Sequence, residues 1–324
     1  MFKKNSTKKW FVLLVIAAVA IGCTKPDDDD DNNGGSGGNL NPTFINGKLP
    51  GLFSVSPTQQ VQFSQGNLQY QASTNTWRFA EHQWDYVGGT DHGGNHFGNV
   101  DGSSNNSISP TYAGWIDLFG WGTSGWDCGN TYFRPWDTAI YGEEYGPLGN
   151  NDLTDSYAHS DWGVHNKISN GGKEAALWRT LKQNEWDYVL HQRSTTSGDR
   201  YAYGRVNNEI GIILLPDNWD NNYYELSNTN SDIENLEDFN NNVISSDIWT
   251  SSLEPNGAVF LPAAGLRTLR SRSMIYYSYN FSYWSASHYD KRHAWACLMA
   301  NLHKFSGYSS RDLGFSVRLV RNTE

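Results

Sequence analysis

Gly314-Phe315-Ser316-Val317-Arg318-Leu319-Val320-Arg321 lies close to the C-terminus, and Tyr283-Trp284-Ser285-Ala286-Ser287 lies upstream of it. Both segments have the apolar content of buried strands. The residues between them are rich in His, Arg, Lys, Asp, Tyr and Trp. Binding residues are commonly carried on loops that a rigid scaffold holds in place. The two segments therefore predict a strand frame around a binding surface.

Further strands are predicted on both sides of this frame. Short alternating runs, separated by turn residues, predict a β-meander at the start of the folded part. Residues 220–252 are polar and Asn-rich and predict an insertion. The predicted strands are 52–55, 61–63, 68–70, 77–79, 210–215, 259–261, 283–286, 293–298 and 315–321.

Two helices are predicted in the middle of the chain. The first covers 162–168 and ends before Asn170-Gly171-Gly172, which is a typical C-terminal cap. The second runs from Leu181 to Gln192, with Thr180 as its N-cap and Gln183 completing a capping box. The chain has 14 Trp, 18 Tyr, 14 Phe and 32 Gly. This composition predicts a helix-poor α+β fold with an aromatic core, short antiparallel strands and long loops.

The N-terminus has the pattern of a secretory signal. Four lysines precede an apolar run that is too short to span a bilayer, and small residues precede Cys23. Residues 1–22 therefore predict a signal peptide, and Cys23 resembles the lipidated cysteine of bacterial lipoproteins. A lipid on Cys23 would attach the protein to a membrane. The alternative is an uncleaved signal anchor with an incidental cysteine.

Residues 23–48 predict a flexible tether, because Asp27–Asp31 and the Asn, Gly and Ser residues after them cannot form a core. Without residues 1–22 the chain has 34 acidic and 20 basic residues, a net charge of −14. This balance argues against nucleic acid as a partner. Residues 49–324 are expected to form the folded domain. Cys128 and Cys297 remain, and either a disulfide or two free thiols fits the sequence.

Two motifs resemble a known enzyme family. Trp178-Arg179-Thr180-Leu181-Lys182-Gln183-Asn184-Glu185-Trp186-Asp187-Tyr188 resembles a helix-starting signature of the formylglycine-generating-enzyme (sulfatase-modifying factor) family. The Gly314–Arg318 segment resembles the Gly-Phe-Arg ending of that family. The resemblance implies a C-type-lectin-like fold of the sulfatase-modifying-factor type. It also implies that Glu185 anchors the start of the helix rather than acting in catalysis.

Other motifs are more similar to the Fibrobacter succinogenes major paralogous domain and related Bacteroidota lipoproteins. They are Asn67-Leu68-Gln69-Tyr70, Trp115 to Gly122, Leu214 to Trp219, and Phe260-Leu261-Pro262-Ala263-Ala264-Gly265. The acidic run behind Cys23 resembles the surface-export signal of such lipoproteins. This resemblance implies an outer-membrane lipoprotein that faces the cell exterior.

An enzymatic function is the alternative interpretation. The formylglycine-generating enzymes use a C-terminal pair of cysteines, whereas the corresponding region here contains only Cys297. A single cysteine in an apolar strand is usually a small core residue. We therefore expect no such catalysis, and a metal-dependent activity stays open. Calcium is the ion that would fit, with Asp217, Asn218 and Asp220 as candidate oxygen ligands; the alternative is that these Asp and Asn residues only form turns and no ion is bound.

The region between the two opening segments is the predicted ligand-binding surface. Tyr, Trp, Arg and His are the side chains that contribute most to binding interfaces. The expected ligand is an extracellular glycan or a protein, which makes the chain an adhesion or binding module. The alternative is a passive surface-coat protein. The candidate binding residues are Tyr279, just upstream of this region, and His288, Tyr289, Asp290, Arg292, His293, Trp295, Asn301, His303, Tyr308 and Arg311 within it.

The same region also resembles the variable segment of proteins diversified by retroelements, which use this fold and end in a similar Gly-x-Ser-Val-Arg motif. That resemblance implies a reverse transcriptase gene and a template repeat close to this gene. The repeat would differ from the coding sequence only at adenines.

Overall fold

A computed structural model describes residues 44–90, 96–100, 108–127, 145–172, 174–268, 273–275, 281–299 and 307–323. These residues belong to one compact unit, Asn41–Glu324, which begins a few residues before the expected domain start at residue 49. The predicted signal peptide, Cys23 and the acidic run lie outside the described residues, as does Cys128. Within the described ranges, no helix has the length and hydropathy required to cross a membrane.

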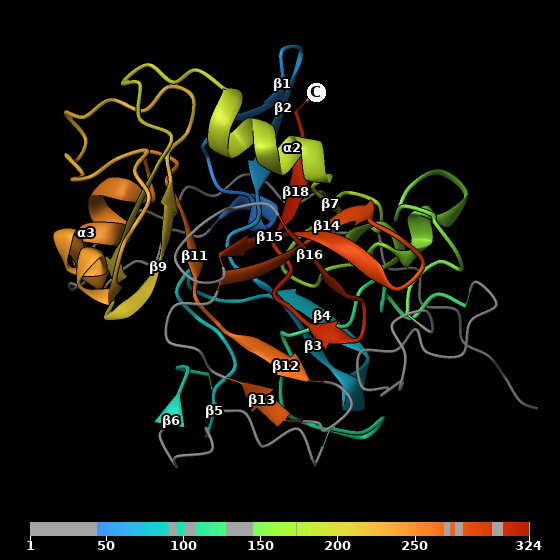
Figure 1. The fold of residues 1–324 in the computed structure, drawn as a ribbon. Coiled ribbons are helices and arrows are strands. Elements are labelled where there is room, and N and C mark those ends of the chain that lie inside the picture. Colours follow the sequence, from blue (N-terminus) through green and yellow to red (C-terminus); the bar gives the residue numbers. More distant parts are fainter. Residues whose placement is uncertain are drawn as a thin grey trace, which may run out of the picture. The chain divides into compact units, whose positions relative to one another are not determined.

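Most of the regular structure consists of short strands (Figure 1). The strands are β1 (Phe53–Ser56), β2 (Gln59–Phe63), β3 (Leu68–Gln71), β4 (Thr76–Phe79), β5 (Gly89–Thr90), β6 (His96–Phe97), β7 (Arg179–Thr180), β8 (Tyr201–Val206), β9 (Glu209–Leu214), β10 (Val243–Ile244), β11 (Val259–Pro262), β12 (Leu266–Thr268), β13 (Ser273–Ile275), β14 (Phe281–His288), β15 (His293–Met299), β16 (Gly307–Ser310), β17 (Leu313–Gly314) and β18 (Leu319–Asn322).

The helices are few and short. The α-helices are α1 (Trp162–His165), α2 (Gln183–Asp187) and α3 (Ser246–Ile248). Short 3-10 and π segments are Ile45–Gly47, Ala72–Thr74, Asp155–Ser160, Tyr188–Gln192, Leu236–Asn241 and Trp249–Leu253. The described fold is therefore helix-poor α+β, as the composition predicted.

Several small sheets share this scaffold. One sheet has the order β1-β2-β18-β7 and joins the two ends of the described chain, so that Figure 1 shows β18 beside β2. A second has the order β10-β8-β9-β11, and β14-β15-β16 forms a third. Their pairings are antiparallel except that between β8 and β10. These sheets alone do not identify the C-type-lectin-like fold that the family resemblance implies.

The segment 314–321 links the β1-β2-β18-β7 and β14-β15-β16 sheets to a further sheet with the order β13-β12-β17. Gly314 pairs with Arg267 of β12, and Ser316 N–H donates to Ser282 O at 2.9 Å. Val320 pairs with Phe63 of β2. A Cβ atom on Gly314 would lie only 2.9 Å from Leu118 O, so this crossing needs a residue without a side chain. The strand frame predicted from this segment is confirmed, although the regular strand begins at Leu319 rather than at residue 315.

Tryptophan side chains fill much of the core. Three of their buried indole N–H groups, those of Trp121, Trp178 and Trp284, donate to backbone carbonyls. Trp284 donates to Phe119 O at 2.7 Å, and Trp121 donates to Ser285 O at 2.8 Å. The fully buried tryptophans are Trp121, Trp162, Trp178, Trp219, Trp249 and Trp284. The hydrogen bonds of Trp121 and Trp284 are directional, so the aromatic core also fixes the positions of the loops around it.

The second predicted helix differs at its start. Thr180 lies in β7, and the helix begins at Gln183 with Lys182 as its N-cap. Glu185 Oε2 accepts from Lys182 N–H at 2.7 Å and forms a two-point ion pair with Arg179. The predicted anchoring role of Glu185 is confirmed. The predicted Thr180–Gln183 capping box is wrong, because the backbone stays extended for two residues longer.

Asp117 gives a pH-dependent prediction. Its carboxylate accepts from Val87 N–H at 2.6 Å, and burial raises its pKa to about 7, although that bond and Arg267 oppose the rise. The pKa of an unfolded aspartate is about 3.9. The folded state therefore binds the proton more tightly than the unfolded state does. The resulting contribution to the free energy of unfolding is fully present below about pH 4 and is lost as the pH rises through about 7.

The free energy of unfolding of the native chain should therefore fall between pH 5 and pH 7.5 by on the order of 2 kcal/mol more than that of Asp117→Asn. Urea denaturation at a series of pH values measures both slopes. Equal slopes for the two proteins would show that Asp117 does not titrate in this way.

Candidate functional site

Strand β15 separates a buried face from an open one. Ala294 and Ala296 point into the tryptophan-rich core. Because side chains alternate along a strand, His293, Trp295 and Cys297 belong to the opposite face. Cys297 is buried in a second core cluster, whereas His293 and Trp295 are partly exposed. The core thus ends between Cys297 and Trp295, and the beginning of β15 carries its side chains to the surface.

Four of the predicted binding residues meet at this open end. We call Tyr289, His293, Trp295 and Tyr308 the aromatic platform. Trp295 and Tyr308 face each other across the β15–β16 pairing. The rings of Tyr289 and Tyr308 stack with centroids 3.8 Å apart and planes 2° apart. Both tyrosines stand nearly perpendicular to Trp295, at 85° and 86°. The platform is an aromatic corner with two differently oriented walls.

The platform tyrosines remain accessible to a ligand. Tyr289 is 43% exposed and Tyr308 is 49% exposed. The neighbouring Tyr308 phenol raises the pKa of Tyr289, which favours the neutral phenol. An uncharged hydroxyl at the end of an exposed ring can both donate and accept hydrogen bonds. The platform therefore offers apolar faces together with adaptable polar ends.

A tight turn between β14 and β15 holds Tyr289 in place. Asp290 Oδ1 accepts from Arg292 N–H at 2.7 Å, from His293 N–H at 2.8 Å and contacts His293 Nδ1 at 2.8 Å. Although burial opposes the effect, these bonds lower the pKa of Asp290. Of the predicted residues, Asp290 thus shapes the turn. Arg292, in the same turn, has an exposed side chain.

Arg311 supports the platform from below. Its side chain was predicted to bind ligand, but it is fully buried, and its guanidinium lies 4.4 Å from the centre of the Trp121 ring. It donates to Asp290 O at 2.6 Å, to Pro147 O at 2.9 Å and to Gly149 O at 3.0 Å. Arg311 therefore joins the turn to the segment around residue 147 and is not exposed to a ligand in this structure.

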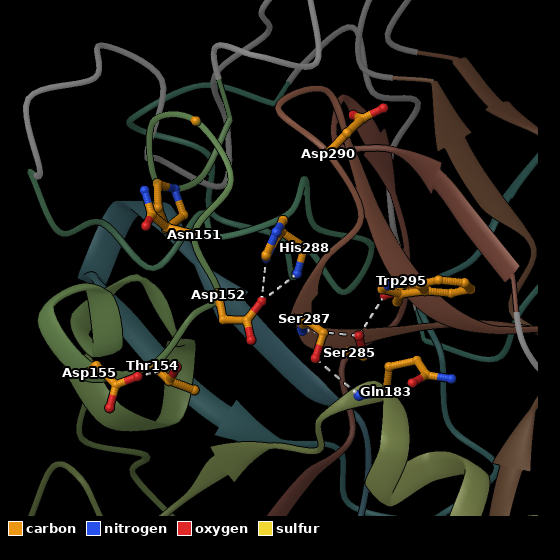
Figure 2. A network of polar contacts seen from close by, with 12 residues as sticks. Asn151, Asp152, Thr154, Asp155, Gln183, Ser285, Ser287, His288, Asp290 and Trp295 are labelled. Carbon is orange, nitrogen blue, oxygen red and sulfur yellow. Dashed lines mark hydrogen bonds and ion pairs between the residues drawn. The ribbon is translucent and has the colours of Figure 1, made fainter.

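His288 connects the platform to a second polar network (Figure 2). Its backbone N–H donates to Asp152 Oδ1 at 2.8 Å, and its Nδ1 lies 2.6 Å from the same oxygen. Ser285 Oγ donates to Trp295 O at 2.8 Å, and Ser287 Oγ accepts from Gln183 N–H at 3.2 Å. These bonds tie the end of β14 to β15 and to α2. Asp152 and Gln183 were not among the predicted residues.

Three predicted binding residues, Tyr279, Asn301 and His303, lie outside the described residues. The described members of the predicted set fall into two groups. The first group lies around one turn and one strand pairing and consists of Tyr289, Asp290, Arg292, His293, Trp295 and Tyr308. His288 precedes this turn, and its side chain contacts Asp152. Arg311 is buried in the core and donates to the backbone of the turn.

Of the predicted calcium ligands, Asp217 has a structural role. Its Oδ1 pairs with the buried Arg193 at 3.0 Å. Its Oδ2 accepts from Ser54 N–H, Ser54 Oγ and Gln60 Nε2 at 2.6–2.9 Å. Both carboxylate oxygens therefore have protein donors. Asp220 Oδ1 accepts from Asn222 N–H, as in a turn. Among the described residues, no three His, Cys, Asp or Glu side chains gather as metal ligands.

Cys297 has the environment of a structural thiol. It is buried, it is free in the described part of the chain, and burial raises its pKa to about 12. A reactive cysteine needs a lowered pKa and solvent access, because the thiolate is the nucleophile. The geometry around Cys297 therefore provides no activation for thiol chemistry.

Comparison of the chain with protein-family models, curated proteins and solved structures found no match.

Proposed function

We propose that this chain is a surface lipoprotein whose folded domain binds an extracellular glycan through the aromatic platform. The single observation behind this proposal is the pair of stacked, nearly half-exposed tyrosines at right angles to Trp295. Exposed aromatic clusters are uncommon on proteins that bind nothing. Arg311 and Asp290 hold this cluster in position, so little conformational freedom is lost on binding.

A glycan fits the platform better than a protein does. A standard protein interface covers about 800 Å² on each partner and about 20–30 residues. The described platform has four aromatic side chains, which is closer to the footprint of one or two sugar rings. The C–H face of a pyranose can pack on an aromatic ring, and its hydroxyls need nearby polar groups. Arg292, whose side chain is exposed on the turn that carries Tyr289, supplies such a group.

The family resemblance supports the same function. A C-type-lectin-like fold of the sulfatase-modifying-factor type would place this hairpin region where related proteins vary. A lipid on Cys23 and a 23–48 tether would present the domain outside the cell. The resemblance to retroelement-diversified proteins adds a genomic expectation, namely a reverse transcriptase gene and a template repeat nearby. Absence of both would remove diversification from the proposal without affecting glycan binding.

A glycan array tests the proposal. The purified full chain should bind a restricted set of glycans, and a Tyr289→Ala/Tyr308→Ala variant with the native melting temperature should lose that binding. Binding to cells that persists after their surface glycans are removed would instead indicate a protein ligand. No binding to either the array or cells would contradict the proposal and favour a passive coat protein.

A further inference from the structure

An exposed leucine lies on the segment that Arg311 joins to the turn between β14 and β15. Leu148 is 51% exposed, which is more than either tyrosine of the platform. Single exposed apolar side chains are common on protein surfaces and need no explanation by themselves. Leu148 differs from such residues because its backbone is held in place and because it lies close to the turn that carries Tyr289.

Three consecutive carbonyl groups around Leu148 are hydrogen-bonded. Pro147 O accepts from Arg311 Nη1 at 2.9 Å, and Gly149 O accepts from Arg311 Nη2 at 3.0 Å. Leu148 O accepts from Asn151 Nδ2 at 2.6 Å. The backbone that carries the exposed side chain is therefore fixed before a ligand arrives, so that little backbone freedom is lost on binding.

The same guanidinium brings Leu148 close to the turn. Arg311 Nη2 donates both to Gly149 O and to Asp290 O, at 3.0 and 2.6 Å. Two carbonyl oxygens that share one donor nitrogen are close neighbours. The residues next to them in the chain, Leu148 and Tyr289, are both exposed and therefore belong to the same part of the surface.

The segment around Leu148 offers both apolar and polar contacts. The leucine provides an aliphatic surface, and the exposed Asn150 provides an amide that can donate and accept hydrogen bonds. A sugar can use this combination, because its C–H groups pack on apolar atoms while its hydroxyls need polar partners. Further along the segment, Figure 2 shows Asp152 in contact with His288 at the end of β14.

The platform and this segment are two separate surfaces on either side of the end of β14. Two consecutive residues contact them, because His288 contacts Asp152 of the segment, whereas Tyr289 belongs to the platform. A single sugar ring would therefore contact only one of the two surfaces. A chain of several sugar residues could contact both.

We propose that the glycan site extends from the aromatic platform across the turn to Leu148, so that its ligand is an oligosaccharide rather than a single sugar residue. This inference rests on the proposed glycan-binding function and deepens it by naming the class of ligand. The platform would hold one part of the oligosaccharide. The side chains of Leu148 and Asn150 would contact a sugar residue further along it.

Calorimetric titration with the strongest array glycan, and with the shorter glycans and monosaccharides obtained from it, tests the extended site. Leu148→Ala removes the proposed contact, and Leu148→Met keeps an apolar side chain of similar volume. Leu236→Ala is the matched control, because Leu236 is also an exposed leucine, at 38%, and lies outside the segment. Trp295→Ala reports on the platform. Melting temperatures show whether each variant folds.

Leu148→Ala should lower the affinity for the full glycan about five- to tenfold, whereas Leu148→Met and Leu236→Ala should stay within about twofold of the native chain. For at least one shorter form, Leu148→Ala should bind like the native chain while Trp295→Ala binds more weakly.

Two results would overturn the extended site and leave the proposed function intact, provided that Trp295→Ala still weakens binding. One is native affinity of Leu148→Ala for every glycan. The other is an equal loss for the full glycan and for the monosaccharides, which would mean that Leu148 acts on the platform through the backbone rather than by contacting a further sugar. Absence of binding to any glycan would contradict the proposed function itself and the inference with it.

Discussion

Replacing Asp217 by alanine is expected to lower the free energy of unfolding by about 3–5 kcal/mol, because removing one partner of a buried ion pair leaves the other charge uncompensated. Arg193 is fully buried, and burial lowers its pKa to about 10, so it stays protonated at neutral pH. The substitution also leaves the Ser54 and Gln60 donors without their acceptor. Chemical denaturation monitored by tryptophan fluorescence measures the loss.

Asp220→Ala is the matched control, because Asp220 lies in the same segment and accepts only a local turn bond. Its effect should stay within about 0.5–1 kcal/mol. The experiment should be repeated in chelator and in calcium. If Asp217 acts mainly as a calcium ligand, its substitution would matter only when calcium is present. Equal losses in both buffers would support the structural role that Arg193 indicates.

Trp295→Ala is expected to reduce affinity for the strongest array glycan by a factor of about 30 or more, which is the loss typical of an interface hot spot of about 2–4 kcal/mol. The side chain forms one wall of the platform and packs against both tyrosines. Its ring centroid lies 5.2 Å from that of Tyr289 and 6.0 Å from that of Tyr308. Because Trp295 is only partly buried, the fold should survive the change. Calorimetric titration measures the affinity.

Tyr223→Ala provides the control for loss of an exposed aromatic ring. Tyr223 is 41% exposed and packs against Trp219, far along the chain from the platform. Its removal should leave glycan affinity within about twofold. Equal losses for Trp295→Ala and Tyr223→Ala would mean that affinity depends on general stability or surface properties rather than on the platform.

The sequence identified the platform because its members share a local pattern. Tyr289, His293 and Trp295 lie on one hairpin, and Tyr308 follows on the next strand. Strand alternation and aromatic content are both visible over a few residues. The positions of β1 to β4 were predicted within a few residues for the same reason.

Roles that depend on distant partners could not be predicted from local pattern. Asp217 occupies an Asp-Asn-Trp-Asp-Asn stretch that is typical of turns or oxygen ligands, yet its donors Ser54 and Gln60 lie 163 and 157 positions away. Asp152 lies 136 positions from His288. No rule of spacing connects such pairs, because they depend on the completed fold.

Arg311 illustrates how a charged residue can be misjudged. Arginine beside exposed aromatic residues usually indicates a binding surface. Here the backbone carbonyls of Pro147, Gly149 and Asp290 surround the guanidinium and replace water as its acceptors. Only the arrangement of these irregular segments reveals the burial. The displaced helix start at Gln183 has a similar cause, since pairing of Thr180 with Leu319 keeps the chain extended.

Hydroxyl-radical footprinting with the bound glycan tests the platform most directly. Tyr289, Trp295 and Tyr308 should each be labelled more slowly when the glycan is present, while labelling of Tyr223 should not change. This result would place the ligand on the described aromatic corner. Unchanged labelling of all three platform residues at a saturating glycan concentration, with protection elsewhere, would contradict the proposed binding site.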